Sequence, residues 1–307
     1  MKKFYLIINP IAGKGAARKA VPEIEQLLNR LNIDYAIQMT EYPGHAIELA
    51  EEAGSNGYQT VVAVGGDGTV NEVINGLMHA AKDGRLTANL AVLPVGRGND
   101  FSFGMGLPKD LEAACGLLAG GKVRKIDIGF LRGGDYPEGR YFGNGVGIGF
   151  DTVVGFEAAK LPPFISGIPA YLIAAIKTVF LYFNAPLLRV EIDDATPLEQ
   201  ACLLLSLMNG RRMGGSFMFA PESESDDGQL NLCITEKITR WQVLSLFPKV
   251  MGGTQTEHPA IKMPMAERVK VTALSGTLPV HADGETICTA GSELEVSILK
   301  QQLQLVC

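Results

Sequence analysis

The stretch from Gly65 to Thr69, Gly-Gly-Asp-Gly-Thr, has the residue types that a phosphate-binding turn needs. It follows the apolar run Thr60–Val64 and precedes a segment of helical period, so it joins a predicted buried strand to a predicted helix. Backbone without side chains lets N–H groups approach a phosphate, and a helix N-terminus adds positive potential. The carboxylate of Asp67 cannot hold a phosphate alone and indicates a Mg²⁺ ion beside a nucleotide. The stretch therefore predicts phosphoryl transfer.

A purely structural interpretation of the same stretch stays open. Thr69 and Glu72 have the spacing of a capping box, in which both side chains only start a helix. Glycines before a helix are also ordinary turn residues. Two phosphate-binding patterns are excluded. Asn71 stands where a dinucleotide-binding loop needs its third glycine, and the turn Asn9–Gly15 lacks the first glycine and the final Ser or Thr of a P-loop.

Length and composition indicate two globular domains and argue against nucleic acid as a partner. The 307 residues exceed the usual size of a single core. A net charge of −6 does not suit a phosphate backbone, which calls for clustered Lys and Arg. Five widely spaced cysteines include no Cys-x-x-Cys pair, which predicts small buried side chains in a reducing cytoplasm rather than zinc or disulfides. The start of the chain leads at once into a strand and predicts no signal peptide.

The first 127 residues alternate apolar runs of strand length with segments of helical period. Such alternation predicts a parallel sheet with crossover helices, which binds ligands beyond the carboxyl ends of its strands. Three glycine-rich turns, Asn9–Gly15, Gly65–Thr69 and Gly96–Asp100, fall at that edge and predict one shared site. The predicted strands are Phe4–Ile8, Tyr35–Met39, Thr60–Val64, Leu90–Leu93 and Val123–Ile128, and the predicted helices cover 21–31, 47–53, 70–78 and 111–118.

After Asp127 the pattern changes to short strands of alternating polarity, which predicts an antiparallel sheet domain with two helices. The predicted strands are Tyr141–Phe150, Leu187–Ile192, Cys202–Met208, Leu230–Ile234, Val269–Leu274 and Leu294–Leu299. The predicted helices lie near Ala170–Phe183 and Trp241–Met251.

The segment Leu161–Phe183 is the most apolar of the chain. Its prolines leave about 14 helical residues, or roughly 21 Å, which is too short for a membrane core of about 30 Å. We favour a core helix here. The alternative is an interfacial element that places aromatic side chains at a bilayer surface. Those aromatic residues are Phe164, Tyr171, Phe180, Tyr182 and Phe183.

Ordered motifs between positions 9 and 285 make the chain resemble the diacylglycerol kinase catalytic family, and most closely its bacterial soluble lipid kinases. The motifs are Asn9-Pro10-x-x-Gly13, Gly65-Gly66-Asp67-Gly68-Thr69-x-Asn71-Glu72, Gly96-x-Gly98-Asn99-Asp100-Phe101, Ile126-Asp127-Ile128-Gly129, Phe142-x-Asn144-x-x-Gly147-x-Gly149-Phe150, Ala220-Pro221 with Asp226-Asp227-Gly228, and Ala282-Asp283-Gly284-Glu285. The resemblance implies a phosphofructokinase-like parallel α/β nucleotide-binding domain over 1–128 and a β-sandwich-like lipid-substrate domain over 129–297. It also implies an active site between them and a C-terminus, about 298–307, that packs back on the first domain.

The resemblance further implies ATP and Mg²⁺ as cofactors. Asp67, Asp100 and Asp127 would form the carboxylate network that holds the catalytic Mg²⁺. Many relatives carry Thr where Arg97 stands, so the nucleotide contact at that position is left open. The residues that would bind ATP are Asn9, Pro10, Gly13, Thr40, Gly65, Gly66, Asp67, Gly68, Thr69, Asn71, Glu72, Arg97 and Asn99.

A second, structural Mg²⁺ site is implied at Glu224, Asp227 and Gln229. Asp227 would give a side-chain oxygen, and the other two would give backbone carbonyls. Hard oxygen ligands in a tight loop suit Mg²⁺. The residues alone are equally well described as an acidic turn with Asp-Gly hairpin chemistry.

By the same resemblance, Asp283 is the general base that accepts the proton of the lipid hydroxyl, and Glu285 is its supporting partner. We expect the tripeptide Asp283-Gly284-Glu285 to be strand-like, with both carboxylates on one face. Seen alone, the same residues describe an Asp-Gly hairpin turn. No histidine is assigned a catalytic role.

The sequence as a whole predicts an ATP-dependent lipid kinase that phosphorylates a lipid hydroxyl, with diacylglycerol as the default acceptor and phosphatidic acid as product. We expect it in the cytoplasm, peripheral at the inner face of the membrane, with a membrane lipid as its partner; whether it forms a homodimer is left open. One alternative is an NAD kinase, which shares the Gly-Gly-Asp-Gly turn. The other is a non-catalytic nucleotide- or lipid-binding regulator. The motifs do not report which lipid is the acceptor.

Overall fold

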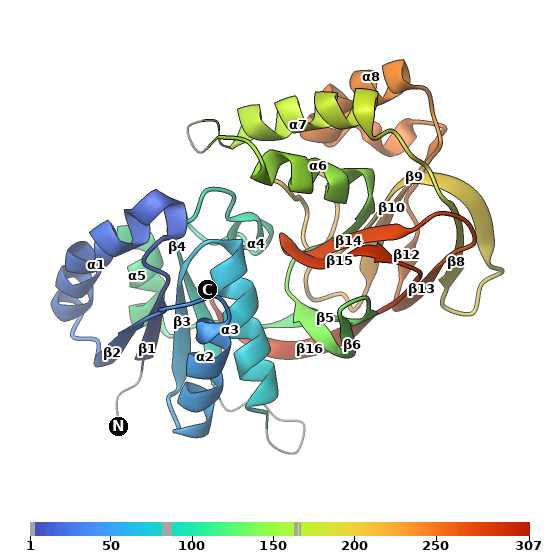
Figure 1. The fold of residues 1–307 in the computed structure, drawn as a ribbon. Coiled ribbons are helices and arrows are strands. Elements are labelled where there is room, and N and C mark those ends of the chain that lie inside the picture. The colour runs from blue at the N-terminus through green and yellow to red at the C-terminus, as the bar shows by residue number, and fades with distance from the viewer. Residues whose placement is uncertain (1–3, 82–87, 163–164, 166) are drawn as a thin grey trace. The chain divides into compact units, whose positions relative to one another are not determined.

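The structure is a computed structural model that describes residues 4–81, 88–162, 165 and 167–307. It divides into two compact units, which Figure 1 draws as ribbons. The N-terminal unit comprises Met1–Ile128 together with Lys300–Cys307, and the C-terminal unit comprises Gly129–Leu299. The last residues of the chain therefore belong to the N-terminal unit. Phe164, one of the aromatic residues that the interfacial alternative places at a bilayer surface, lies outside the described residues.

A parallel sheet with the order β2-β1-β3-β4 forms the centre of the N-terminal unit. This confirms the sheet predicted from the alternation of strands and helices. The end of the last strand, β16, adds to its edge, where Leu305 pairs in parallel with Leu90. The bounds of the four strands are β1 (Phe4–Ile8), β2 (Tyr35–Met39), β3 (Thr60–Gly65) and β4 (Asn89–Pro94).

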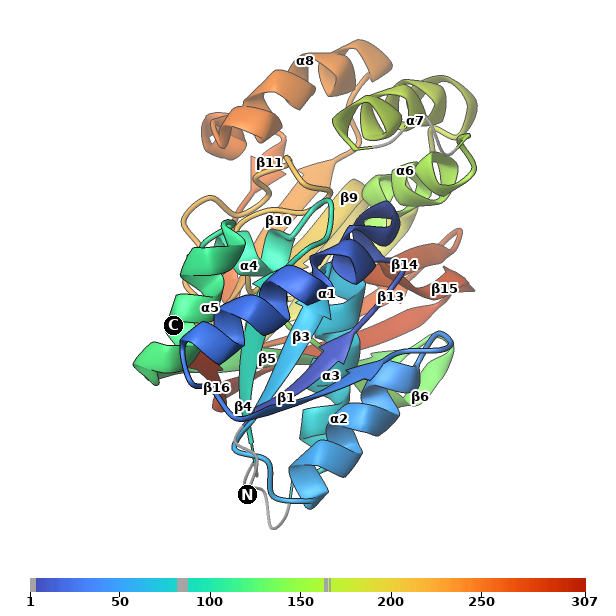
Figure 2. The ribbon, with the colours of Figure 1, turned by 90° about the vertical axis from the view of Figure 1, so that its left-hand side faces the viewer.

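Helices α1 and α5 cover one face of this sheet, as Figure 2 shows with both in front of the strands. Their apolar side chains pack on alternate strand residues such as Leu6, Ile8 and Val62. Helices α2 and α3 pack closely on each other at Gly76, because a Cβ atom there would lie 2.2 Å from the carbonyl oxygen of Ile47. The helix bounds are α1 (Ala12–Arg30), α2 (His45–Ser55), α3 (Asp67–His79), α4 (Asp100–Gly104), which was not predicted, and α5 (Leu111–Gly120).

The C-terminal unit is built on antiparallel strands in the order β15-β14-β7-β9-β8-β13-β16. Strand β10 adds to β9 and carries β11 and β12, and β5, whose first residues belong to the N-terminal unit, pairs with β6. Apolar side chains of nearly all these strands share one buried core, as expected of a sandwich-like domain. The bounds are β5 (Val123–Gly133), β6 (Tyr136–Phe142), β7 (Gly145–Gly149), β8 (Leu187–Ile192), β9 (Leu198–Met208), β10 (Leu230–Glu236), β11 (Ile261–Lys262), β12 (Met265–Ala266), β13 (Arg268–Ala273), β14 (Leu278–Ala282), β15 (Glu285–Gly291) and β16 (Glu293–Val306).

Three helices lie on one side of these strands, and Figure 1 shows them gathered there. Helix α6 contacts β7, β9 and β14, and α7 packs against α6 and α8. No helix among the described residues is long and apolar enough to cross a membrane. Their bounds are α6 (Phe150–Ala159), α7 (Ile168–Leu181) and α8 (Arg240–Gly252).

The prediction of a single strand over Tyr141–Phe150 is wrong. The segment contains the end of β6, a turn, all of β7 and the first residue of α6. Gly149 has a φ of 95°, a value that glycine adopts without strain, and the chain changes there from strand to helix.

The cysteines mostly fill small buried positions, as predicted. Cys115, Cys202, Cys233 and Cys288 are buried, Cys307 is half-buried, and none of the five is bonded to another. Burial raises the pKa of the Cys233 thiol to about 12. Such a thiol carries almost no thiolate at neutral pH and is unreactive.

Candidate active site

The three glycine-rich turns of the N-terminal unit meet, as the sequence predicts. They follow β1, β3 and β4, which are neighbouring parallel strands. A Cβ atom on Gly96 would lie 2.3 Å from the Cα atom of Gly66, and one on Gly13 would lie 2.4 Å from the carbonyl oxygen of Val95. Real Cβ atoms do not approach so closely, so the turns touch through bare backbone. The contact explains why glycine stands at these positions.

Two carboxylates, the buried Asp100 and the half-buried Asp67, are brought together beside these turns, around Gly98. Asp67 begins α3, and its Oδ1 atom accepts a hydrogen bond of 3.0 Å from the backbone N–H of Phe101. A Cβ atom on Gly98 would lie 3.0 Å from Oδ2 of Asp67 and 3.6 Å from Oδ2 of Asp100. The two oxygens therefore face the same bare stretch of backbone. Paired hard oxygens are the donors that Mg²⁺ prefers, so this part of the predicted network fits the ion.

Asp127 has a different environment. It is fully buried in β5, and its Oδ1 atom accepts a hydrogen bond of 2.6 Å from the backbone N–H of Gln301. Gln301 itself has a φ of 48°. Asp127 thus anchors the returning C-terminal strand. Among residues 4–81, 88–162, 165 and 167–307, no group of three His, Cys, Asp or Glu side chains is placed to hold a metal ion. The membership of Asp127 in a metal network stays a prediction.

Glu72 ties α3 to α2 rather than capping its own helix. Because α3 begins at Asp67, Thr69 lies inside the helix, and the capping-box interpretation of Thr69 and Glu72 is wrong. The two oxygens of Glu72 instead accept hydrogen bonds from the backbone N–H groups of Gly44, at 3.0 Å, and Ala46, at 3.1 Å. These N–H groups begin α2, so the carboxylate satisfies exposed donors and complements the helix dipole.

Thr69 and Asn71 are also part of the internal packing. A Cβ atom on Gly65 would lie 2.4 Å from Oγ1 of Thr69, so the threonine rests on the glycine. Asn71 is fully buried, and its backbone carbonyl accepts a hydrogen bond of 2.8 Å from the side chain of Asn75. Both residues shape the turn after β3. Direct contact of either with ATP stays a prediction.

The turn after β4 is closed by Asn99. Its Oδ1 atom accepts a hydrogen bond of 3.0 Å from the backbone N–H of Gly96, and its Nδ2 atom donates one of 3.2 Å to the carbonyl of the same residue. Asn99 has a φ of 52°, a conformation that asparagine tolerates better than most residues. Arg97 is exposed at the tip of this turn. Asn99 therefore fixes the loop that presents Arg97.

The turn after β1 runs through an unusual backbone conformation. Gly13, Lys14 and Gly15 have φ values of 59°, 60° and 86°. The side chain of Asn9 accepts a hydrogen bond of 3.2 Å from the backbone N–H of Ile11 and stabilises the entry to this turn. Thr40 follows β2, and its N–H donates to the carbonyl of Ile8 at 2.9 Å. Pro10 lies in the same turn.

Asp283 lies in the C-terminal unit, in the turn between β14 and β15. Ala282 pairs with Glu285, which leaves Asp283 and Gly284 as a two-residue hairpin loop with φ values of 49° and 87°. This is the Asp-Gly hairpin that the residues alone describe. Asp283 is buried and Glu285 is exposed. The expected strand-like segment with both carboxylates on one face is wrong, because the chain reverses between them.

The carboxylate of Asp283 is held by three backbone N–H groups of the turn between β6 and β7. Its Oδ2 atom accepts from Gly143 at 2.7 Å, and its Oδ1 atom accepts from Asn144 and Gly145, each at 2.9 Å. Hydrogen bonds to an ionised group are stronger than neutral ones. Asp283 therefore has one fixed orientation.

Two asparagines outside the predicted site residues complete this arrangement. Asn209 is fully buried, and its Nδ2 atom donates to the carbonyl of Gly143 at 2.8 Å. Asn144 donates from Nδ2 to the carbonyl of Arg212 at 2.9 Å. Asn144 stood within a motif, but its partner is far along the chain. A buried Asn directly after a strand is the signal that could have indicated Asn209.

A histidine–aspartate pair lies beside Gly147. Its histidine, His281, belongs to β14, the strand that leads to Asp283, and pairs with Gly147 in the sheet. Nε2 of His281 is 3.4 Å from Oδ2 of Asp151, the second residue of α6. A Cβ atom on Gly147 would lie 2.0 Å from that carboxylate oxygen and 2.3 Å from that ring nitrogen. The motif glycine at 147 therefore makes room for the pair.

The acidic loop from Glu224 to Gln229 forms a tight turn. The backbone N–H of Gln229 donates to Oδ1 of Asp227 at 2.8 Å, and Gly228 has a φ of 75°. Partial burial raises the pKa of the Asp227 carboxyl. The observed geometry fits the acidic-turn interpretation. Binding of a structural Mg²⁺ by this loop stays a prediction.

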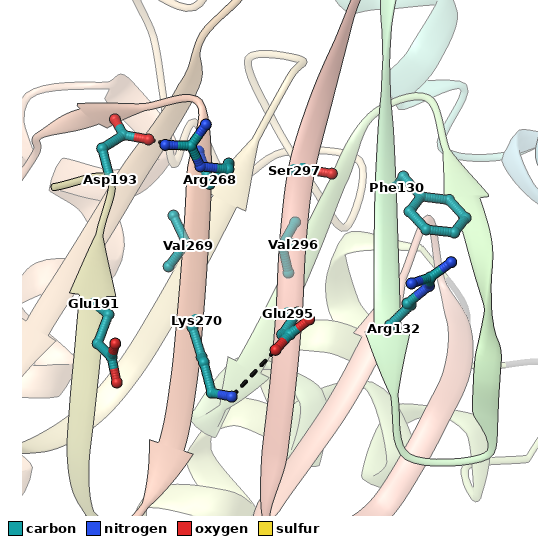
Figure 3. A pocket seen from close by; sticks show the side chains of 10 residues that line it. All are labelled: Phe130, Arg132, Glu191, Asp193, Arg268, Val269, Lys270, Glu295, Val296 and Ser297. Carbon is teal, nitrogen blue, oxygen red and sulfur yellow. Dashed lines mark hydrogen bonds and ion pairs between the residues drawn. The ribbon is translucent and has the colours of Figure 1, made fainter.

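One surface hollow of about 460 Å³ lies on the strands of the C-terminal unit, and Figure 3 shows its lining. Cations and carboxylates alternate along it, and Lys270 forms an ion pair with Glu295 at 3.1 Å. The hollow contains none of the predicted site residues. It is lined by Phe130, Arg132, Glu191, Asp193, Arg268, Val269, Lys270, Glu295, Val296 and Ser297.

An α/β unit whose glycine-rich turns meet beside paired carboxylates, joined to a unit of antiparallel strands, defines a two-domain kinase fold. The sequence model described as diacylglycerol kinase catalytic domain matches residues 3–131, and the one described as YegS C-terminal NAD kinase beta sandwich-like domain matches residues 144–307. The chain therefore belongs to the diacylglycerol kinase family. It is a kinase with an alcohol acceptor, as its family implies.

Similar proteins agree with this assignment. A diacylglycerol kinase of Staphylococcus saprophyticus is 30% identical over 285 residues, which cover 92% of this chain and 89% of that protein. A diacylglycerol kinase of Staphylococcus aureus strain RF122 is 31% identical over 285 residues, which cover 92% of this chain and 86% of that protein. A crystal structure of a diacylglycerol kinase from Bacillus anthracis strain Sterne has a TM-score of 0.75 at 21% identity. The match covers 99% of this chain and 96% of that one. The structure of an NAD kinase of Archaeoglobus fulgidus in complex with ATP has a TM-score of 0.54 at 13% identity. The match covers 99% of this chain and 93% of that one, so the two share the fold.

Proposed function

We propose that this chain transfers the γ-phosphoryl group of ATP to the free hydroxyl of diacylglycerol and forms phosphatidic acid at a membrane surface. The observation that carries the proposal is the meeting of three bare turns beside Asp67 and Asp100. Bare backbone at the carboxyl edge of a parallel sheet suits the phosphates of a nucleotide. Relatives named diacylglycerol kinase support this acceptor over a soluble one.

Asp67 and Asp100 would hold Mg²⁺, which neutralises charge on the transferring phosphoryl group when it is bound. The N–H groups of the turns would orient the phosphates. The hydroxyl oxygen of the lipid bonds to the γ-phosphorus, the bond from that phosphorus to the bridging oxygen breaks, and ADP leaves. The hydroxyl proton passes to the carboxylate of Asp283. Positioned proton acceptors typically contribute about 10²–10⁴ in rate.

The direct test incubates the purified chain with ATP labelled at the γ-phosphate, Mg²⁺ and one acceptor at a time. The acceptors are diacylglycerol in detergent micelles, a total lipid extract, and NAD. We expect labelled phosphatidic acid and no labelled dinucleotide. Labelled NADP without labelled lipid would instead assign an NAD kinase. ATP binding without transfer to any acceptor would assign a regulator.

A matched pair of variants checks that the label comes from this site. Asp67→Asn removes one of the two paired charges beside Gly98. Asp135→Asn makes the same change at an exposed residue between β5 and β6. We expect the first variant to lose transfer and the second to retain it.

A further inference from the structure

Helix α7 has two apolar faces, and the larger side chains are on the outer one. Leu172, Ile176 and Phe180 are 42, 43 and 49% exposed, and their spacing of four residues places them along one line of the helix. Ile173, beside this line, is exposed to the same extent. A helix at an ordinary protein surface has its polar side chains on the outer face.

The inner face of α7 carries mostly smaller side chains, and Tyr171 is partly buried against the same core. Ala174, Ala175 and Val179 are buried in the core that α7 shares with α6 and α8. The core-helix interpretation of the segment Leu161–Phe183 is therefore right for this face only. The packing of the domain does not account for the large residues on the other face.

Trp241 extends the apolar surface to the neighbouring helix α8. It is 73% exposed, and its ring lies edge-on to that of Phe180 with centroids 6.3 Å apart. Exposed contiguous apolar surface of this kind marks an interaction site. We call the set the outer α7 surface: Leu172, Ile173, Ile176, Phe180 and Trp241, all exposed.

The exposed charges of helix α6 and of α7 and α8, which carry the outer α7 surface, are basic. Over positions 150–181 and 240–252 the acidic residues are Asp151 and Glu157, whose side chains are only 10 and 3% exposed. The basic residues of the same segments are Lys160, Lys177, Arg240 and Lys249, and all of them reach solvent. Lys160 and Lys177 both pair with Glu157, and the segments together have a net charge of +2. The chain as a whole has a net charge of −6, so this region departs from the overall charge.

Apolar and aromatic side chains within a basic border match the interface of an anionic bilayer. A second copy of the chain fits less well. A two-fold interface through this surface would place each basic border against the other, and like charges repel. The charge complementarity therefore favours a lipid surface.

We infer that the outer α7 surface docks the protein on bilayers that contain anionic lipids, with Trp241 and Phe180 at headgroup depth. The inference rests on the proposed function in naming where the enzyme meets its lipid, but docking itself needs neither ATP nor phosphoryl transfer. Binding has an apolar and an electrostatic part, so it weakens as salt rises.

Trp241 is the single tryptophan of the chain and reports docking by its own fluorescence. The experiment adds vesicles of phosphatidylcholine, alone or with phosphatidylglycerol, to the full chain without ATP or diacylglycerol. We expect a blue shift and quenching by brominated acyl chains with the anionic vesicles, and weak binding to the neutral ones. An unshifted spectrum with anionic vesicles overturns the inference.

Variants separate this surface from others. We expect the double variant Leu172→Ser, Ile176→Ser to lower vesicle affinity by about tenfold or more, because two aliphatic side chains that become buried in the bilayer contribute at least that much. We expect Lys249→Glu to lower the affinity further at low salt. Leu274→Ser changes an equally exposed leucine elsewhere in the unit and should leave affinity unchanged. Equal affinity of the double variant and this control would overturn the inference. So would a double variant whose main change is a lower oligomeric mass, because the surface would then be a contact between copies.

Activity on a short-chain, soluble diacylglycerol distinguishes a failure of the inference from a failure of the proposed function. The docking variants should phosphorylate that acceptor at the wild-type rate. Vesicle binding without phosphorylation of any lipid would leave the docking surface in place and overturn the proposed function alone.

Discussion

The Oδ2 atom of Asp283 lies 2.7 Å from the backbone nitrogen of Gly143, which precedes it by 140 positions in the sequence. Together with the N–H groups of Asn144 and Gly145, this contact makes the carboxylate the link between two turns of the C-terminal unit. A residue proposed to accept a proton is thus also a structural residue. Any test of its chemistry needs a control for its structural role.

Gly96→Ala tests the contact between the glycine-rich turns. The new Cβ atom would lie 2.3 Å from the Cα atom of Gly66. Because this is a backbone atom, it cannot move aside as the end of a flexible side chain could. We expect the free energy of unfolding to fall by about 1–3 kcal/mol, as in overpacked sites, and the affinity for an ATP analogue to fall with it. Calorimetric titration and denaturant unfolding measure the two effects.

The matched control for this change is Gly116→Ala. Gly116 lies inside α5 with open space around its Cα atom, so alanine is expected to stabilise the helix by up to about 1 kcal/mol. Wild-type nucleotide affinity in Gly96→Ala would show that the turns do not form a nucleotide site.

Gly98→Ala tests the pairing of Asp67 with Asp100. Its Cβ atom would lie 3.0 Å from one carboxylate oxygen and 3.6 Å from the other, so the side chains must shift slightly while the fold stays intact. We expect a higher Mg²⁺ concentration for half-maximal kinase activity and an unchanged unfolding midpoint. A Mg²⁺ titration of initial rates measures this, and an unchanged half-saturation point would argue against a metal ion held there.

Much of the N-terminal unit is predictable because its signals are local. The predicted bounds of β1 are those that the structure gives, since a short apolar run between polar turns is typical of a strand buried on both faces. The sequence does not indicate helix α6, because Thr152, Val153 and Val154 are β-branched and Gly155 follows them. These residues disfavour a helix, and packing against β7 and α7 overrides that preference.

Long-range hydrogen bonds are likewise not predictable from local sequence, because they depend on tertiary contacts. The spacing of Thr69 and Glu72 suggested a local cap, whereas Glu72 bonds to a helix start 28 positions away. Likewise, the hairpin at Asp283 could be described from two residues, but its partners in the turn at Gly143 could not. Sequence spacing indicates which residues are polar and near a turn, while tertiary contacts decide what they bind.

Glu72→Gln separates a structural role for Glu72 from a nucleotide contact. The amide presents a donor to one of the two N–H groups that begin α2, so we expect stability to fall by about 1 kcal/mol. Affinity for an ATP analogue should be unchanged. The control is Glu25→Gln on the exposed side of α1, which should alter neither quantity. A selective loss of nucleotide affinity would instead support the ATP contact.

The ion pairs of Glu157 predict a pH dependence of stability. Hydrogen bonds from Lys160, then Lys177, lower the pKa of this carboxyl. A carboxyl whose pKa is lowered on folding stabilises the protein above its ordinary pKa of about 4.3, and that stability is lost as pH falls through the lowered value. We therefore expect Glu157→Gln to be less stable than wild type at neutral pH and the difference to shrink below about pH 4.

Denaturant unfolding of both proteins between pH 7 and pH 3 measures this difference. Glu138→Gln, at an exposed position on β6, serves as the control and should differ little from wild type across the range. A Glu157→Gln difference that grows as pH falls would have the opposite sign from the one these ion pairs require.

The proton-accepting role of Asp283 has a structural control in the same unit. Asp193 also lies in a left-handed turn, with a φ of 46°, and its carboxylate accepts hydrogen bonds from the backbone N–H groups of Glu267 and Arg268. Asp283→Asn and Asp193→Asn therefore disturb similar turns. Both should lower the unfolding midpoint, and both should retain affinity for an ATP analogue.

The most direct measurement is the turnover number of these two variants with ATP, Mg²⁺ and diacylglycerol. We predict that Asp283→Asn loses about 10²-fold or more in turnover, while Asp193→Asn stays close to wild type. Turnover of Asp283→Asn within a few-fold of wild type would contradict this prediction, as would an equal loss in both variants.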